Sequence, residues 1–280
     1  MELFHYADAK EFYAEAEQFL IKSEIENNLT IGVLRAVIGN TSDSQVPCML
    51  LVKEKNEVIL TFTMRGSHTA IIGYGSEVDA IDLIINYMST NNMKIKRVTA
   101  DYELSTYFSK QWTTCTGQSS VVRVDQIIYA TNGIVERKSI PGTLKKAVIE
   151  EEDNISEIIY KFFEETGQKI SFEVARKKAN LSILNEDLFV WHDGEIVCVA
   201  KKVRETPNCA IISMVYTPKP YRSKGYASAC VSELSKQLLL KGYRYCILHA
   251  DSDNHISTNL YESIGYHAVG RLITYHFFYE

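Results

Sequence analysis

The sequence predicts an α/β fold of the α+β kind, built as two similar domains in tandem. Apolar residues form short strand-length runs, as at 48–53 and 57–64, and recur at helical spacing, as at 77–90. Three strands followed by a helix, a strand, a helix and a strand then occur twice along the 280 residues. Each half is therefore expected to form a mixed, mostly antiparallel central sheet flanked by helices.

The first half begins with a helical pattern at 9–27. The next two strands are separated by Glu54-Lys55-Asn56, which has the composition of a hairpin turn. An apolar run at 69–72 leads through Gly73-Tyr74-Gly75-Ser76 to the helix at 77–90. The remaining expected elements are a strand at 95–100, a helix at 102–112 and a strand at 121–130.

Residues 131–142 contain glycine, proline and charged residues. We take them as the connection between a first domain, 1–130, and a second domain, 143–280. The expected strands of the second half are 143–149, 188–192, 195–204, 209–217, 244–250 and 266–279. Its expected helices are 153–166, 171–184, 225–241 and 256–264. No residue-level identity links the halves, so a duplication is inferred from element order alone.

Composition excludes several functional classes. The net charge of −5 argues against a nucleic-acid-binding protein, whose usual mark is a concentrated basic surface. The six cysteines have neither C-x-x-C nor zinc-ligand spacing, so we expect core thiols, no metal and a reducing, cytoplasmic setting. The N-terminus lacks the pattern of a signal peptide, and no apolar run approaches the roughly 20 residues that span a membrane.

The most informative stretch runs from Thr217, where a strand ends, to a helix that starts near Gly225. It contains the pattern Arg222-x-x-Gly225-x-Ala227. The first N–H groups of a helix are free and its dipole is positive there, so this position suits an anion, a diphosphate especially. Gly225 lets a phosphate approach the backbone, and Arg222 and Lys224 add positive charge. By itself the pattern also fits a solvated loop and helix start.

Further motifs favour the anion-binding interpretation over the solvated loop. Val-Tyr-Thr-Pro at 215–218, Arg-x-x-Gly-Tyr-Ala at 222–227, Asp-x-x-Asn at 251–254 and Leu-Tyr-x-x-x-Gly-Tyr at 260–266 follow one another. In this order and spacing they resemble the acetyl-CoA half of a GNAT superfamily N-acetyltransferase. The resemblance covers roughly 209–279 and extends, by element order, back to about 143.

The resemblance implies that acetyl-CoA is the acyl donor and that an amine of a small molecule or a peptide is the acceptor. The strand at 214–217 would separate from its neighbour at 244–250 and pair with the pantetheine amides. The residues expected to bind the cofactor are Val215, Thr217, Arg222, Ser223, Lys224, Gly225, Tyr226, Ala227, Ser228 and Asn254.

Tyr261 holds the position of a general acid that protonates the leaving CoA thiolate. A phenol, with a reference pKa of about 10, is protonated at neutral pH. A buried tyrosine in a helix also often only packs and hydrogen-bonds, and this second interpretation stays open.

The sequence does not identify a general base. The candidates Glu173, His192, Glu195, Glu205 and Asp251 fit solvated positions as well. Tyr275 and His276 are weak acceptor-site candidates on a C-terminal strand whose aromatic residues also suit a core.

In the first half, Gly73–Glu77 stands where the phosphate-binding loop would be. It has no arginine or lysine, and Glu77 and Asp79 would satisfy the helix N-terminus and repel phosphate. We expect a degenerate copy that does not bind CoA and instead packs against the second half, shapes the acceptor cleft or mediates a homodimer. A non-catalytic acyl-CoA-binding sensor or interaction protein is the alternative function, and a longer acyl donor stays open.

Overall fold

The computed structural model describes residues 1–39, 48–75, 77–136 and 139–279. The chain forms two compact units. The first unit consists of Met1–Tyr129, His249–Asn254 and Ala268–Glu280, and the second of Ala130–Leu248 and His255–His267. Ser76 of the expected first-half loop, and residues 137 and 138 of the expected connection, lie outside the described residues.

The first unit is a mixed sheet with four helices. Its helices are α1 (Ala9–Lys22), α2 (Asn28–Ile38), α3 (Ala80–Thr90) and α4 (Tyr102–Thr116). Its strands are β1 (Glu2–Tyr6), β2 (Cys48–Glu54), β3 (Glu57–Arg65), β4 (Thr69–Ile72), β5 (Arg97–Asp101), β6 (Ser119–Thr131) and β12 (His267–Phe278). They lie in the order β1-β2-β3-β4-β5-β12-β6. β4 and β5 run parallel, whereas the pairs β1–β2, β2–β3, β3–β4 and β5–β12 are antiparallel.

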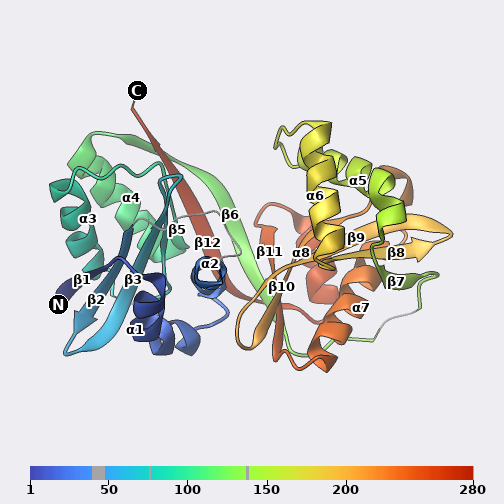
Figure 1. Cartoon of the computed structure of the whole chain (residues 1–280), viewed down its shortest axis with the longest axis horizontal. Coiled ribbons are helices and arrows are strands. Elements are labelled where there is room, and N and C mark those ends of the chain that lie inside the picture. Colours follow the sequence, from blue (N-terminus) through green and yellow to red (C-terminus); the bar gives the residue numbers. More distant parts are fainter. Residues whose placement is uncertain (40–47, 76, 137–138, 280) are drawn as a thin grey trace. The chain divides into compact units, whose positions relative to one another are not determined.

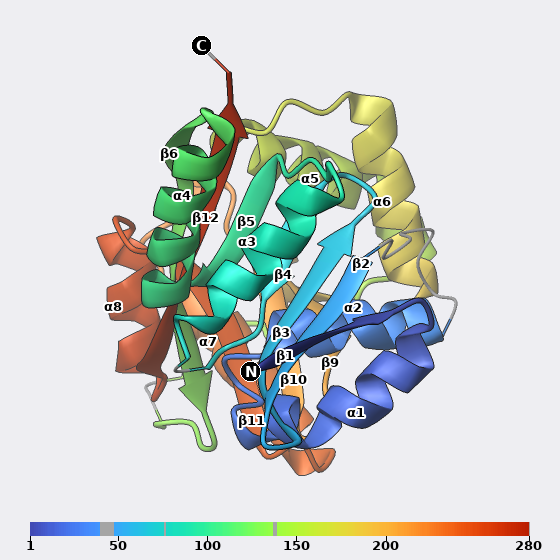
Figure 2. The same ribbon diagram turned by 90° about the vertical axis from the view of Figure 1, so that its left-hand side faces the viewer.

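Alternation along β2 gives this sheet two apolar faces. Leu50 and Val52 pack with residues of α3 and α4 in one core cluster. Met49 and Leu51, which point to the other face, pack with α1 and α2 in a second cluster. Figure 2 shows α3 and α4 crossing the strands of this unit.

The last strand of the chain completes the core of the first unit. β12 pairs with β5 from Leu272 opposite Asp101 to His276 opposite Arg97. Phe277 is buried against Phe108 and Trp112 of α4. The C-terminal residues therefore stabilise a core whose other members come from the first half of the sequence. The domain limits 1–130 and 143–280 stay a prediction.

The second unit repeats the same order of elements (Figure 1). Its strands are β7 (Thr143–Lys146), β8 (Leu188–Asp193), β9 (Glu195–Glu205), β10 (Cys209–Tyr216) and β11 (Tyr245–Asp251). Its helices are α5 (Glu152–Glu165), α6 (Phe172–Leu184), α7 (Tyr226–Leu240) and α8 (His255–Ser263), with short 3₁₀ turns at Ile149–Glu151 and Lys219–Tyr221. The order β7-β8-β9-β10-β11 matches β1-β2-β3-β4-β5, and β10 and β11 are again the parallel pair.

Helices cover both faces of this second sheet. α5 and α6 pack on Leu188 and Val190 of β8 in one cluster. α7 contacts the other side of β8 and β9, as Figure 1 shows. The predicted α/β fold class, with mixed and mostly antiparallel sheet structure flanked by helices, is confirmed.

Two expected elements differ in detail. The helix expected at 9–27 is α1, which ends at Lys22, and a second helix that the sequence did not predict, α2, begins at Asn28. The turn between them buries Asn27, whose amide bonds to groups distant in the sequence. The terminal segment 266–279 is the one strand β12. Within the described residues, no helix has the length and apolar character needed to cross a membrane.

Candidate functional site

The exposed end of β10 is the first feature of the site. Its parallel pairing with β11 runs from Cys209↔Tyr245 to Ile212↔Leu248, whereas β10 continues to Tyr216. On its other side, the register with β9 shifts between Ser213 and Tyr216. Met214 takes a φ of 49°, as expected where an extra residue makes a β-bulge. The bulge leaves the backbone around Val215 without the regular ladder pairing, so it is available to an extended ligand.

The loop after β10 leads into an open helix N-terminus. Gly225 is the N-cap of α7 with a φ of 85°, a left-handed conformation that glycine adopts without strain. No side chain caps the helix among the described residues. The first N–H groups of α7, those of Tyr226, Ala227 and Ser228, therefore face the loop together with the positive end of the helix dipole. This arrangement can hold an anion.

The side chain of Arg222 serves the loop rather than the helix end. Its Nε donates to the Thr217 carbonyl oxygen at 2.9 Å, and its Nη2 donates to Glu165 Oε2 at 2.6 Å. The other carboxylate oxygen of Glu165 accepts a 2.8 Å bond from the Tyr216 hydroxyl, and the Arg222 guanidinium lies over the Tyr216 ring. Arg222 lowers the pKa of Glu165, whereas burial and then Glu165 raise the pKa of Tyr216 to about 12. Glu165 therefore fixes the end of β10 and the loop together.

Two further carboxylates hold the same loop from the hairpin between β8 and β9. Tyr226 donates to Asp193 Oδ2 at 2.6 Å. Tyr221 hydrogen-bonds to Glu195, which raises the pKa of that phenol. Lys224 lies over the Tyr221 ring, while Ser223 takes a φ of 63° and is exposed. The side chains of the loop are thus largely occupied, so its backbone is the part left to bind a ligand.

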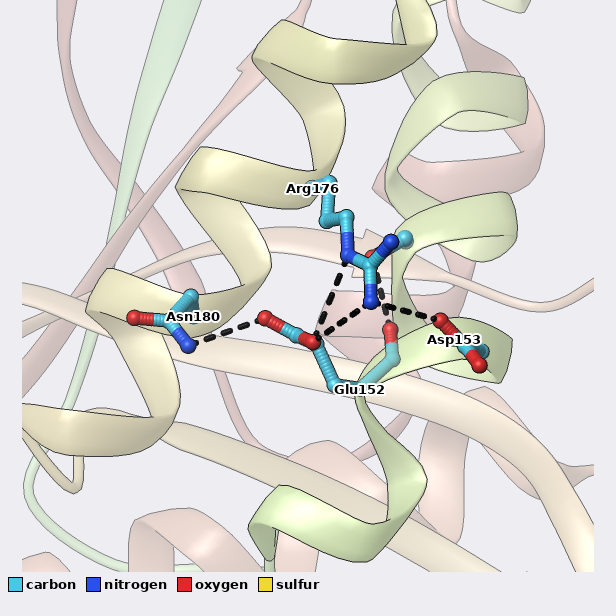
Figure 3. A network of polar contacts seen from close by, with 5 residues as sticks. Glu152, Asp153, Arg176 and Asn180 are labelled. Carbon is cyan, nitrogen blue, oxygen red and sulfur yellow. Dashed lines mark hydrogen bonds and ion pairs between the residues drawn. The ribbon is translucent and has the colours of Figure 1, made fainter.

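Helix α5, which ends at Glu165, is anchored at its other end by α6 (Figure 3). Glu152 in its first turn accepts from Arg176 Nη2 at 3.3 Å and from Asn180 Nδ2 at 2.9 Å. Arg176 also pairs with Asp153 at 3.3 Å. Because both ends of α5 are tied, Glu165 is a rigid support for the loop.

Tyr261 of α8 is buried, with 7% of its surface exposed. Burial first, and then the neighbouring thiols of Cys198 and Cys230, raise its pKa above the ordinary value of 10. The Cys230 and Cys198 thiols lie beside each other, and Cys198 also lies beside the Thr217 hydroxyl. The structure thus brings Tyr261 and Thr217, distant in sequence, to the same pair of thiols. Sequence reasoning treated both cysteines as core residues and gave no signal for this neighbourhood.

Asn254 lies between β11 and α8, in the segment that packs with the first unit. Its N–H donates to the Asp251 carbonyl oxygen at 2.9 Å. The role expected for Asn254 therefore stays a prediction.

The base candidates have other partners. Glu173 pairs with Lys177, Glu205 with Lys202, and the Asp251 carboxylate accepts from Gln126. Of the acceptor-site candidates, Tyr275 lies in the first unit, with its hydroxyl 3.4 Å from the Thr106 hydroxyl. The pKa of His276, which lies in the same unit, is lowered by burial and then by Arg97 and Arg123. His192 ends β8 next to the hairpin turn. No residue of this set emerges as a base.

The equivalent loop of the first unit is filled by its own side chains. Asn27 Oδ1 accepts from the Tyr74 N–H at 2.7 Å, and the Gly73 N–H donates to the Thr61 carbonyl oxygen at 2.9 Å. A Cβ on Gly73 would meet the Thr61 hydroxyl at 2.2 Å. The N–H groups of Gly73 and Tyr74 are therefore already bonded, and the space beside Gly73 is occupied.

The described part of the chain contains no group of three or more His, Cys, Asp or Glu side chains placed to hold a metal ion. All six cysteines are free thiols.

Comparison with known families decides the class of the second unit. Residues 153–266 match the profile of the Acetyltransferase (GNAT) family. This part of the chain is a GNAT-family domain. The matched residues include β10, the loop, α7 and Tyr261. No curated protein matches the chain by sequence.

Solved structures show that the GNAT-family domain belongs to a shared whole-chain fold. An acetyltransferase from the GNAT family of Colwellia psychrerythraea is similar over 99% of this chain and 100% of its own, with a TM-score of 0.62 at 12% identity. A GCN5-related N-acetyltransferase from Sphaerobacter thermophilus is similar over 98% and 94%, with a TM-score of 0.63 at 16% identity. One from Kribbella flavida covers 78% and 86%, with a TM-score of 0.51 at 12% identity. At these identities the likeness shows the fold alone.

Proposed function

We propose that the second unit transfers an acetyl group from acetyl-CoA to an amine of a small molecule or a peptide. This proposal rests on the segment that extends from the bulged end of β10, through the loop, to the uncapped N-terminus of α7. Both lie in the GNAT-family domain. This run offers exposed backbone along a strand and then a concentration of free N–H groups. That combination suits a ligand with amides at one end and phosphates at the other.

The binding roles then follow from which groups are free. The backbone at Val215 and Thr217 pairs with the pantetheine amides, and the N–H groups from Gly225 to Ser228 hold the pyrophosphate. Arg222 has a supporting role in this proposal, because Glu165 already takes its guanidinium. Ser223 and Lys224 are exposed on the loop and contribute to its surface.

Acyl transfer from a thioester to a neutral amine forms a C–N bond and breaks a C–S bond. The amine nitrogen gives up one proton to solvent, and the leaving sulfur takes one up. Tyr261 is suited to supply it. Its raised pKa keeps the phenol protonated at neutral pH. Its ring lies near the Cys198 thiol, which in turn lies beside the hydroxyl of Thr217, the residue after β10. The low polarity of these surroundings strengthens any hydrogen bond that the phenol makes.

We further propose that the first unit is a copy without a cofactor site. Asn27 and Thr61 take two backbone donors of its loop, the N–H groups of Tyr74 and Gly73, and Glu77 and Asp79 place negative charge before α3. Its role is structural support or shaping of the acceptor site. The free thiols fit a reducing compartment, as in the cytoplasm.

Calorimetric titration with acetyl-CoA, followed by a screen of amines for CoA release, tests the proposal. We expect one site per chain and turnover with at least one class of amine. Tyr261→Phe should bind acetyl-CoA as the parent does, yet lose about 10²-fold or more in kcat, the usual contribution of a general acid. Tyr266→Phe is a matched control that removes another buried phenol of the same unit. Equal kcat for Tyr261→Phe and the parent would remove Tyr261 from the mechanism, and absence of acetyl-CoA binding would overturn the proposal.

A further inference from the structure

The sheet of the first unit has a polar surface at β5, β12 and β6, on the face that carries α1 and α2. α1 packs mainly on β1, β2 and β3, and α2 mainly on β4. On the opposite face, Val98 of β5 and Phe277 of β12 are buried with residues of α3 and α4. Side chains that alternate with these two residues therefore point to the face of α1 and α2. They include Thr99 and Thr274, whose hydroxyl oxygens lie 2.8 Å apart.

Positive charge gathers beside this pair of hydroxyls. Arg97 of β5 lies directly opposite His276 of β12, so both side chains point to the same face. Arg123 belongs to β6, which lies on the other side of β12. Burial, and then the charges of Arg97 and Arg123, lower the pKa of the His276 imidazole. Two guanidinium groups, one from each neighbouring strand, thus flank one imidazole ring.

These charges have no internal counterion in the part of the chain that the structure describes. Arg97 and Arg123 are exposed and form no ion pair there. Asp125, two residues further along β6, is already bound, because Arg271 Nε donates to its Oδ1 at 2.7 Å. Like charges gathered in this way repel one another in the free protein. An anion bound between them would remove this repulsion and gain attraction to both guanidinium groups.

We infer that Arg97, His276 and Arg123 form a binding site for the phosphate group of a small molecule. A guanidinium group binds phosphate through two parallel hydrogen bonds. Because β12 separates β5 from β6, the backbones that carry the two arginines lie about 10 Å apart, twice the spacing of neighbouring strands. A tetrahedral phosphate held between them offers oxygens to both guanidinium groups and to the imidazole, whereas one carboxylate has two oxygens and satisfies one guanidinium.

Ring signals of His276 in NMR spectra of the full chain provide the test, because His276 lies in the first unit and the loop before α7 lies in the second. Methyl phosphate, titrated at constant ionic strength, should shift these signals to saturation and raise the pKa of the imidazole, since an anion favours its charged form. Acetate, which carries one carboxylate on the same methyl group, should bind at least about 10-fold more weakly. No saturable shift with methyl phosphate, or equal affinity for acetate, would overturn the inference.

Substitution of the two arginines identifies the contacts. Arg97→Gln and Arg123→Gln should each weaken methyl phosphate binding about 10-fold, because each removes charge-assisted hydrogen bonds. Lys110→Gln is the matched control, since it removes an exposed positive charge from α4 and should leave the affinity unchanged. Without phosphate, Arg97→Gln should also raise the pKa of His276, because a repelling charge is lost. Equal weakening by all three variants, or by none, would overturn the inference.

Discussion

Replacement of Gly225 by alanine tests quantitatively the packing of the loop before α7, which we propose to bind phosphate. The residue has a φ of 85°, and a left-handed conformation costs a residue with a Cβ about 1–2 kcal/mol. The new methyl group would also lie 3.0 Å from Ile140 Cδ1. Because that atom ends a side chain, we assign the crowding the lower limit of overpacking, about 1 kcal/mol. Gly225→Ala should therefore lower the free energy of unfolding by about 2–3 kcal/mol.

Gly194→Ala separates the two contributions. Gly194 lies in the β8–β9 turn of the same unit with a φ of 74°, and no atom lies within 4 Å of its expected Cβ. This control has the backbone cost alone, about 1–2 kcal/mol. In an Ile140→Val background, which lacks the δ methyl group, the excess cost of Gly225→Ala over Gly194→Ala should disappear.

Urea unfolding followed by tryptophan fluorescence provides the assay. Trp191 belongs to the second unit and Trp112 to the first, so a Trp112→Phe background reports the second unit alone. The same variants should show weaker acetyl-CoA binding for Gly225→Ala than for Gly194→Ala. If Gly225→Ala costs no more than its control, and the Ile140→Val background changes nothing, the contact between the connection and the loop is wrong.

Two further predictions concern polar contacts. Glu165 has a lowered pKa, so its contribution to stability is present above the unfolded value near 4.5 and is lost as the pH falls through the folded value. Glu165→Gln should raise the KM for acetyl-CoA at neutral pH. It should also reduce the loss of unfolding free energy below about pH 4.5, measured by urea unfolding at several pH values. If the variant loses as much stability in acid as the parent, Glu165 does not stabilise the loop. Asn27→Ala should destabilise the first unit by about 1–3 kcal/mol, because the bonds to the Tyr74 N–H and the Leu20 carbonyl oxygen are lost. Asn91→Ala, which removes an exposed amide of that unit, should cost much less in the same thermal scans, and equal losses would contradict this account.

Much of the donor site is readable from local sequence. A strand expected to end at Thr217, a glycine at the start of a helix and the spacing to Tyr261 are short-range features, and they carry the GNAT resemblance. The parts that sequence reasoning missed are long-range. Glu165 lies 57 residues from Arg222, and Asn27 lies 47 residues from Tyr74. No periodicity or motif connects residues at such distances.

The sequence by itself determined the order of helices and strands from β2 onward, the family resemblance of the second half and the loop before α7 that we propose to bind phosphate. These depend on side-chain alternation, helical spacing and the free N–H groups of a helix start, all of which act within a few residues. Only the tertiary structure decided that β12 completes the core of the first unit and that Arg222 supports the loop through Glu165. It also decided that Ile140 lies against Gly225. Such contacts are selected by the burial of apolar surface and the pairing of buried polar groups across the fold, which depend on every element at once.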